Sequence, residues 1–164
     1  MSEFVCIGKI VNTHGIKGEV RVLSDFEKKE LVFKKEMTFY VGELKKEFKV
    51  VGYRHHKMFD MVIFDGVHSI NDVLEYKGKK VYVKREDLKL LKDDYLYEDL
   101  IGFTVYDEDK EIGNVSEVWD SNGNVLLQIK YEKYYYIPLK SEYIKKIDLE
   151  NHKIITSKGS ELIL

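Results

Sequence analysis

Short runs of strand-forming residues, separated by turn residues, constrain the fold of this chain more than any other feature. Runs that are rich in Val, Ile, Phe and Tyr and are bounded by Gly or charged residues are typical of β-strands. Several of them precede residue 85, and the short connections between them favour a small antiparallel barrel or sandwich. These runs lie at residues 7–11, 20–23, 37–41, 48–53, 58–64 and 79–83.

One short helix is expected among these strands. Ser69 can serve as the N-cap, Asp72 follows as the acid of a capping box, and Gly78 can end the element. The apolar residues between them fall on one helical face. We therefore expect a helix over residues 69–76 that covers one end of the first barrel.

The second half of the chain repeats this pattern with sharper turns. Asn122-Gly123 lies between two such runs and is the strongest two-residue hairpin signal in the chain. Pro138, the single proline, has no N–H to donate, so it should lie at the end or the edge of a strand. The runs of this half lie at residues 100–106, 112–119, 125–130, 134–138, 144–149 and 153–156.

A polar stretch separates the two halves. Residues 84–94 lack strand alternation and contain neither Pro nor Gly, which is typical of a linker that need not be freely jointed. We therefore expect an all-β protein of two small β-barrels joined by a short linker, with one short helix in the first domain. The expected domains are residues 1–84 and 93–164, and the expected linker is residues 85–92.

The composition, 44% hydrophobic and 34% charged among 164 residues, is that of a globular rather than a disordered protein. No apolar run approaches the about 20 residues that a membrane helix needs, and no signal segment opens the sequence. We therefore expect a cytoplasmic protein that does not bind membranes. Cys6, the single cysteine, excludes an internal disulfide, and its place in a predicted strand leads us to expect a buried, inert thiol.

The net charge of −2 conceals an asymmetry between the halves. Residues 1–84 hold 16 Lys and Arg and 12 Asp and Glu, a net charge of +4, whereas residues 85–164 hold 11 and 17, a net charge of −6. Halves of opposite sign suggest domains that face different partners. Binding of a phosphate backbone by the whole protein is disfavoured, because it needs a concentrated basic face, and the acidic half suits a basic protein.

The loop between the first two runs combines glycines with chemically active side chains. Its glycines reach positive φ without a Cβ clash, which a tight turn needs. The spacing is not that of a phosphate-binding loop, and no helix follows. Two interpretations stay open: a hairpin whose glycines serve geometry alone, or a contact loop, because Ile16 would be an apolar residue exposed on a turn. The loop consists of Thr13, His14, Gly15, Ile16, Lys17 and Gly18.

Metal and catalytic sites have little support in the sequence. His55 and His56 are adjacent on a predicted strand and therefore point to opposite faces, and no Cys, His or Asp cluster completes a tetrahedral site. No pair of candidate acids is fixed on one surface, and no nucleophile motif occurs. We therefore expect no metal, no cofactor and no enzymatic activity, with a turn or surface role for the two histidines. The candidate acids are Asp60, Asp65, Asp99 and Asp107.

The first half opens with three short elements: Gly8-Lys9-Ile10, the Thr-x-Gly-Ile-x-Gly string of residues 13–18, and Arg21-Val22. These elements resemble the opening of the RimM family, whose members begin with Gly-Lys-apolar, Thr-x-Gly-Ile-x-Gly and Arg-Val. The second half is similar to the PRC-barrel domain that follows in RimM proteins. Its matching elements are Asp99-Leu100-Ile101-Gly102, Ile112-Gly113-Asn114-Val115, Asn124-Val125-Leu126, Ile137-Pro138 and residues 143–149.

The resemblance implies a partner-binding site at the start of the second domain. RimM proteins carry an aromatic pair there that is implicated in partner binding, and here Leu96 stands where the family has the second aromatic. The expected partner-binding residues are Tyr95 and Tyr97 as apolar anchors, with Asp94, Glu98 and Asp99 as rim charges.

Burial in the core is the alternative role for the aromatic residues of this half, because aromatic side chains also fill small barrels. In Tyr134-Tyr135-Tyr136, strand alternation places Tyr135 on the opposite face from its neighbours, so one side of this strand must belong to the core.

The resemblance also implies a function. A RimM protein is a non-enzymatic maturation factor that binds the head of the small ribosomal subunit through a basic head protein, the nineteenth of the small-subunit series, and supports processing of the subunit's RNA. We expect a monomer whose +4 half neighbours ribosomal RNA and whose −6 half binds protein. The alternative is a stand-alone RNA-binding barrel of the OB or translation-factor type, which needs aromatic and basic side chains along one groove.

Overall fold

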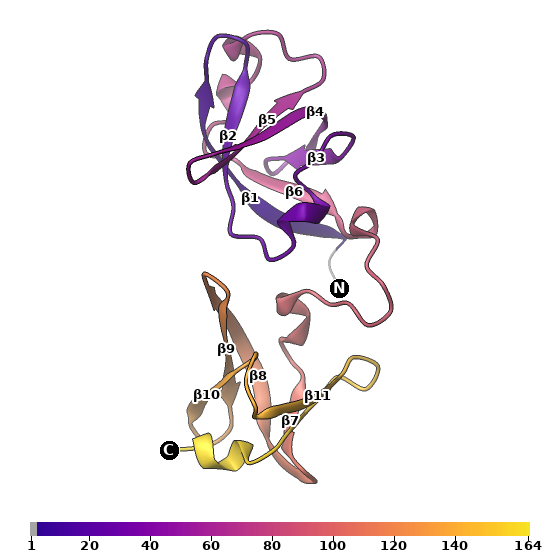
Figure 1. Ribbon diagram of the computed structural model, residues 1–164, viewed down its shortest axis with the longest axis vertical. Coiled ribbons are helices and arrows are strands. Elements are labelled where there is room, and N and C mark those ends of the chain that lie inside the picture. The colour runs from indigo at the N-terminus through magenta and orange to yellow at the C-terminus, as the bar shows by residue number, and fades with distance from the viewer. Residues whose placement is uncertain (1–2) are drawn as a thin grey trace. The chain divides into compact units, whose positions relative to one another are not determined.

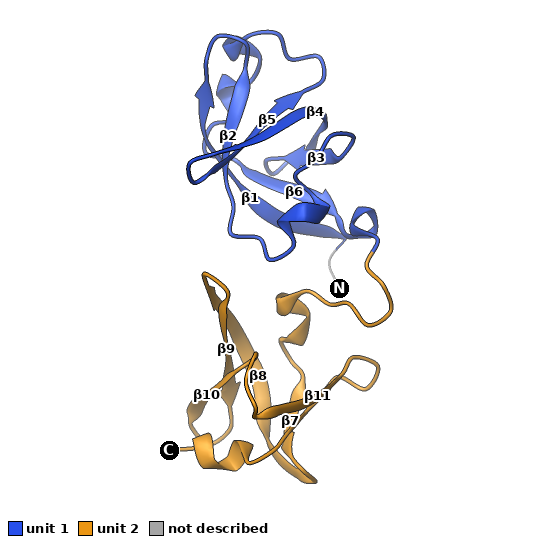
Figure 2. Cartoon of the chain, in the orientation of Figure 1, with its two compact units in different colours: residues 1–89 blue, residues 90–164 orange. Residues whose placement is uncertain are grey.

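The computed structural model describes residues 3–164, and the chain divides into two compact units, Met1–Lys89 and Leu90–Leu164 (Figure 2). Twelve strands and six 3₁₀ turns make up the regular structure of the described residues, which contain no α-helix. The all-β prediction is confirmed. No helix formed by residues 3–164 has the length and apolarity needed to cross a membrane.

The first unit is a closed six-stranded antiparallel barrel (Figure 1). The order around it is β1-β2-β5-β4-β3-β6, and β6 pairs with β1 to complete the ladder. Closure leaves no sheet edge on which another chain could add a strand. The strands are β1 (Phe4–His14), β2 (Glu19–Leu23), β3 (Thr38–Val41), β4 (Lys46–His56), β5 (Phe59–Phe64) and β6 (Lys80–Lys84).

The inward-facing residues of each strand fill this barrel. β2 buries Val20 and Val22 completely, and Phe39 and Phe64 meet edge to face with their ring centroids 6.1 Å apart. Burying one such side chain fully contributes about 1.5–3 kcal/mol. A shift of one residue would turn this set of side chains toward water, so the alternation fixes the register.

Two short turns replace the helix that we expected over residues 69–76. The predicted capping box between Ser69 and Asp72 is present, but the chain continues as 3₁₀ turns η2 (Ile70–Asp72) and η3 (Leu74–Tyr76). The stretch that ends at Gly78 is too short to offset the cost of nucleating an α-helix, and burial of Val73 between the turns decides the local conformation instead.

The second unit is a six-stranded sheet with one parallel pair. Its order is β10-β9-β8-β7-β12-β11, and β12 runs parallel to β7 whereas the other pairs are antiparallel. Its ladder is not closed as that of the first unit is, so β10 and β11 are edge strands. The strands are β7 (Thr104–Asp107), β8 (Lys110–Ser121), β9 (Asn124–Lys130), β10 (Tyr134–Pro138), β11 (Ile144–Asp148) and β12 (Lys153–Thr156).

The turn residues of the second unit lie where the sequence predicts them. Asn122 and Gly123, with φ values of 52° and 88°, form the two-residue turn between β8 and β9, and Ser121 pairs with Asn124 at its base. Pro138 is the last residue of edge strand β10. The predicted hairpin and the predicted place of the proline are both confirmed.

The aromatic residues of β10 divide between core and surface as alternation requires. Tyr135 is buried, and its hydroxyl donates a hydrogen bond to the carbonyl oxygen of Ile112. Tyr134 and Tyr136 lie on the exposed face, where the ring of Trp119 lies 5.3 Å from that of Tyr136. One face of the strand is therefore core, as predicted.

The expectation of a buried cysteine is wrong. In β1 the side chains of Val5 and Ile7 are buried, and Cys6 between them is exposed. The alternation of the strand outweighs the general tendency of cysteine to be buried.

Candidate partner-binding groove

Two carboxylates hold the segment that opens the second unit. Asp94 accepts a 3.0 Å hydrogen bond from the N–H of Leu91, and Asp99 accepts a 2.9 Å hydrogen bond from the N–H of Leu96. The second of these begins the 3₁₀ turn η5 (Tyr97–Leu100). Local side-chain to backbone bonds of this kind fix the backbone from which the two predicted tyrosines project.

Tyr95 and Tyr97 belong partly to the core and partly to the surface. Both side chains are half-buried and pack against the apolar core of the second unit. The Nζ atom of Lys140 lies 6.0 Å from the centroid of the Tyr97 ring. Leu96 between them is 1% exposed, so the residue that replaces the second aromatic of the family is inaccessible to a partner.

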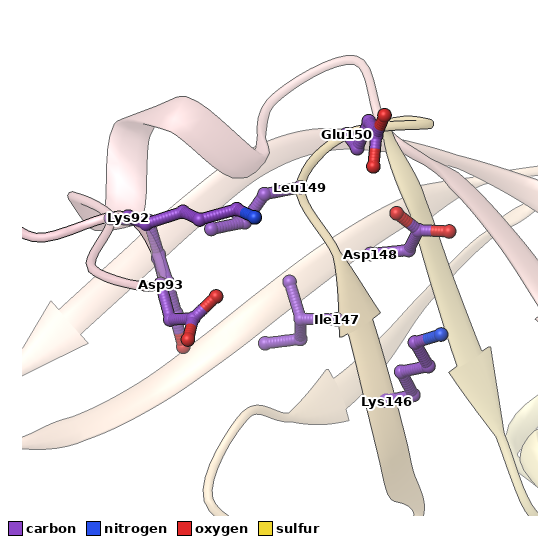
Figure 3. A pocket seen from close by; sticks show the side chains of 8 residues that line it. Lys92, Asp93, Lys146, Ile147, Asp148, Leu149 and Glu150 are labelled. Carbon is purple, nitrogen blue, oxygen red and sulfur yellow. The ribbon is translucent and has the colours of Figure 1, made fainter.

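Tyr95 lines a groove of about 620 Å³ beside edge strand β11. Lys92 and Asp93 lie on one wall, and the opposite wall is formed by residues 146–150, from β11 and the turn after it (Figure 3). Apolar side chains from this second wall pack against the core of the unit and give the groove a fixed, partly apolar surface. They are Ile147 and Leu149.

The groove has an acidic balance. The side chain of Asp148 accepts hydrogen bonds of 2.9 and 3.1 Å from the side-chain amide and the backbone N–H of Asn151, and these bonds hold its pKa below the usual value. Asp148 is therefore ionised at neutral pH. The lining of the groove therefore contains three carboxylates and two ammonium groups. The charged residues are Asp93, Asp148, Glu150, Lys92 and Lys146.

The structure does not gather all the predicted partner-binding residues around this groove. Tyr95 lines it, whereas the other four do not belong to its lining. The wall formed by residues 146–150 was not predicted as a site, because it comes from a strand about fifty residues further along the chain. The four residues outside the lining are Asp94, Tyr97, Glu98 and Asp99.

The candidate contact loop of the first unit joins β1 to β2. Gly15 and Gly18 have positive φ values of 71° and 87°, and a Cβ on Gly18 would stand 2.8 Å from the carbonyl oxygen of Ser69. Ile16 is 83% exposed, as the contact-loop interpretation requires. The backbone of the loop is therefore fixed while an apolar side chain faces solvent. Lys17 is also exposed, and Thr13 and His14 are half-buried.

One candidate acid, Asp60, is occupied by internal hydrogen bonds in the first unit. Its carboxylate accepts bonds of 2.9 Å from Nζ of Lys29 and 2.7 Å from Oη of Tyr53. Burial opposes its ionisation, but these bonds, with a third contact to His55, outweigh burial and lower the pKa of Asp60. This carboxylate therefore stabilises the barrel.

A second candidate acid, Asp107, serves the second unit in the same way. It accepts hydrogen bonds from the backbone N–H groups of Lys158 and Ser160, both 3.1 Å long. Among residues 3–164, no group of three or more His, Cys, Asp or Glu side chains is placed to hold a metal ion.

Two protein-family models match this chain. The model described as the RimM N-terminal domain matches residues 5–88, and the model described as the RimM PRC barrel domain matches residues 97–162. This chain belongs to the RimM family.

Relatives in the RimM family span nearly the whole chain. A protein named Ribosome maturation factor RimM from Staphylococcus haemolyticus is 41% identical over 153 residues, which are 90% of this chain and 92% of the relative. The protein of the same name from Staphylococcus aureus strain bovine RF122 / ET3-1 is 38% identical over 162 residues, 96% of this chain and 97% of the relative. A crystal structure from Pseudomonas aeruginosa, described as a 16S ribosomal RNA processing protein RimM, covers 96% of this chain and 99% of its own at 20% identity, with a TM-score of 0.46.

The features described above can each be assigned to one of the two RimM domains or to the residues between them. The contact loop and Asp60 lie in the RimM N-terminal domain. The β11 wall of the groove lies in the RimM PRC barrel domain, whereas Lys92, Asp93 and Tyr95 come just before the first residue that this domain matches.

Proposed function

We propose that this RimM-family protein is a ribosome maturation factor that binds the head of the small ribosomal subunit and supports its assembly and the processing of its RNA. One observation carries the proposal: 41% identity, over 90% of this chain, to a protein named Ribosome maturation factor RimM. In this proposal the factor holds a ribosomal protein and nearby RNA in position until the subunit has folded, and then leaves.

The second unit is the proposed binder of a basic head protein, the nineteenth of the small-subunit series. Residues 85–164 carry a net charge of −6, and three carboxylates line the groove. Tyr95 offers a half-buried ring whose orientation is fixed by packing, and aromatic anchors of this kind dominate binding energies at protein interfaces. Acidic groups around such an anchor steer a basic partner toward it.

The proposed action is binding rather than catalysis. Two of the acids that could have formed a catalytic pair, Asp60 and Asp107, lie in different units and are each occupied by internal hydrogen bonds. An acid–base pair needs two carboxyl groups that reach one substrate. This arrangement supports a factor that works by occupying a site on the subunit.

A direct binding measurement tests the groove. Isothermal titration of the purified full chain with the purified head protein should show that Tyr95→Ala weakens binding about 30-fold or more, the effect of losing a hot-spot aromatic. Tyr134→Ala is the matched control, because Tyr134 is a 55% exposed tyrosine on β10, the other edge of the same sheet. This control should bind as the wild type does.

A second variant separates binding from folding, because Tyr95 also packs on the core. Glu150→Lys reverses an exposed charge in the groove without removing a packed side chain, and it should weaken binding while the circular dichroism spectrum and melting temperature stay unchanged. If both Tyr95→Ala and Glu150→Lys fold and bind the head protein normally, the groove is not the binding site.

Co-sedimentation tests the wider proposal. The wild-type chain should sediment with immature small subunits and not with mature ones, and the Tyr95→Ala variant should remain in the unbound fraction. A wild-type chain that binds neither form of the subunit would contradict a role in maturation.

A further inference from the structure

The outer face of barrel strands β2, β5 and β4 carries a cluster of cationic and aromatic side chains. The strand register places Arg21, Met61 and Arg54 side by side in one row across the three strands. His56 pairs with Phe59 in the next row. Because directly opposed residues share a face of the sheet, these side chains form one continuous surface.

Arg21 lies at the centre of this cluster, and no ion pair to an acid is found for it among residues 3–164. Its Nη2 atom donates a 2.9 Å hydrogen bond to Nδ1 of His14, and its guanidinium carbon lies 5.5 Å from the centroid of the Phe59 ring. A guanidinium can only donate, so Nδ1 of His14 accepts and this ring carries its proton on Nε2. The Nε atom of Arg21 is buried and finds no acceptor among the described residues. The positive charge of Arg21 therefore faces a neutral imidazole.

The carboxylate of Glu19, two residues before Arg21 on β2, is already neutralised by another cation. Glu19, which pairs with His14 across β1 and β2, accepts bonds of 3.0 and 2.8 Å from Nε and Nη2 of Arg54. This bidentate pairing lowers the pKa of Glu19 and uses both of its oxygens. The pair is neutral as a whole, so Arg21 and the exposed Lys57 leave the surface with a net positive charge.

The positive charge of this surface affects the pKa of a second histidine, His56. The ring centroids of His14 and His56 lie 6.3 Å apart. Partial burial lowers the pKa of His56, and the positive charges of Arg54, Lys57 and Arg21 lower it further. A surface that disfavours an added proton in this way favours an anion.

A structural role accounts for only part of the arrangement. Met61 is 0% exposed although it lies on the outer face, so the side chains beside it shield it from water. The aliphatic stems of arginines are well suited to such shielding. Shielding does not require a guanidinium that lacks an acid, because an uncharged side chain of similar length would serve.

We propose that this surface binds the phosphate backbone of RNA. In this site Arg21 supplies the charge that lacks an acid, Lys57 lies at the rim, and the rings of Phe59 and His56 offer faces on which a base can stack. Arginine suits this task because its planar fork of donors matches a phosphate group. Rings beside a cationic groove are the usual platform for single-stranded RNA.

The charge of the first half favours an anion of some kind, since residues 1–84 carry a net charge of +4. The choice of RNA rather than an acidic protein rests on the proposed function, in which this half neighbours ribosomal RNA. The cluster itself does not depend on that proposal. The test therefore measures RNA binding without any ribosomal protein.

Fluorescence anisotropy of the full chain with a labelled single-stranded RNA of about 12 nucleotides tests the site. Arg21→Gln should weaken binding about tenfold, as expected for the loss of one charge-assisted contact. It should also reduce the slope of log affinity against log salt concentration by about 0.7, the value for one single-strand phosphate contact. Lys46→Gln is the matched control, because it removes one exposed charge from the other end of β4 and should change binding little.

A second variant covers the case in which Arg21→Gln fails to fold. Lys57 has a positive φ of 56°, a conformation that asparagine tolerates, so Lys57→Asn removes the rim charge without new backbone strain. It should weaken RNA binding about threefold and leave the melting temperature unchanged. Poly-glutamate added as a competitor should displace the RNA poorly.

Three results would overturn the proposal: no RNA binding by the wild type, equal losses in Lys57→Asn and Lys46→Gln, or displacement by poly-glutamate as effective as that by unlabelled RNA. The third would assign the surface to an acidic protein. Failure here differs from failure of the proposed function, because Lys57→Asn should bind the basic head protein normally in either case.

Discussion

Tyr53 and Asp60 meet inside the β4–β5 hairpin, where Oη of the tyrosine donates a 2.7 Å hydrogen bond to a carboxylate that is 1% exposed. Lys29, from the 3₁₀ turn η1 (Lys29–Leu31), binds the other oxygen. Burial, and to a lesser degree Asp60 itself, raises the pKa of Tyr53 to about 12, so the hydroxyl remains a donor at neutral pH. Two strands and a turn of the barrel are thus joined at one buried charge.

Removing this hydroxyl should reveal a stability contribution that depends on pH. The pKa of Asp60 is lower in the folded protein than its ordinary value of 3.8, so its contribution is complete above about pH 4 and is lost as the pH falls through the folded pKa. Tyr53→Phe should therefore lower the free energy of unfolding by about 1 kcal/mol at pH 7. The difference from wild type should shrink below pH 4, as followed by urea unfolding at several pH values.

Tyr134→Phe is the matched control for this experiment, because Tyr134 is largely exposed. It should change stability by a few tenths of a kcal/mol at most at either pH. A Tyr53→Phe difference that is the same at pH 3 and pH 7 would show that Asp60 is not the source of the effect.

The two glycines of the contact loop should differ in their tolerance of a methyl group. A Cβ added to Gly15 would meet no atom within 4 Å, so Gly15→Ala should cost about 1 kcal/mol for left-handed backbone alone. A Cβ on Gly18 would also stand 2.6 Å from Cγ1 of Val67, which adds about 1–3 kcal/mol of overpacking. Urea unfolding of the two variants measures the difference. Equal losses would mean that the close approach at Gly18 is relieved without cost.

Asp94→Asn should affect how fast the head protein associates. The asparagine keeps an oxygen that can accept the hydrogen bond from the N–H of Leu91, so the turn persists while the charge is removed. The association rate should fall about threefold at low salt, and the dissociation rate should not change. Stopped-flow measurements at low and high salt provide the test, with Asp109→Asn at an exposed turn as the control. An effect confined to dissociation would place Asp94 in direct contact with the partner.

RNA affinity of the first unit should rise as the pH falls. The pKa of His56 lies below 6.5 because of burial and the surrounding cations, so this ring is neutral at pH 7 in the free protein. A bound phosphate favours the charged imidazole, so binding takes up a proton and should tighten about tenfold between pH 7.5 and pH 5.5. His56→Gln should flatten this dependence in the anisotropy assay. An unchanged slope in that variant would assign the proton to another group.

Local chemistry was enough to predict the strands and the sharpest turns. Asn122 and Gly123 have the positive φ values that their residue types favour, and the capping box at Ser69 is present. What the sequence could not decide was how far the element after Ser69 would extend. That length depends on burial of Val73, which is a tertiary effect. The exposure of Cys6 could have been predicted from alternation, had that pattern been preferred to the residue's average burial.

The groove was beyond local analysis. Tyr95 was predicted from a family resemblance, but the opposite wall follows from the parallel pairing of β12 with β7 and the attachment of β11 to β12. No pattern within a strand indicates which distant strand will be its neighbour. The cationic surface was missed for a related reason: Arg21 lies more than thirty residues before Arg54 and His56 in the sequence and shares a face with them only through the register of three strands.

The parallel pairing of β12 also has a consequence for when the groove can exist during synthesis. β11 has one neighbour in the sheet, β12, and β12 reaches the rest of the unit through β7. The barrel of the first unit has all its strands once Lys84 has been translated, whereas the groove has no second wall until residues 153–156 have been made. A chain whose synthesis ends between these points has every strand of the barrel and lacks the second wall of the groove. If a partner binds at the groove as proposed, that binding requires that translation has passed β12.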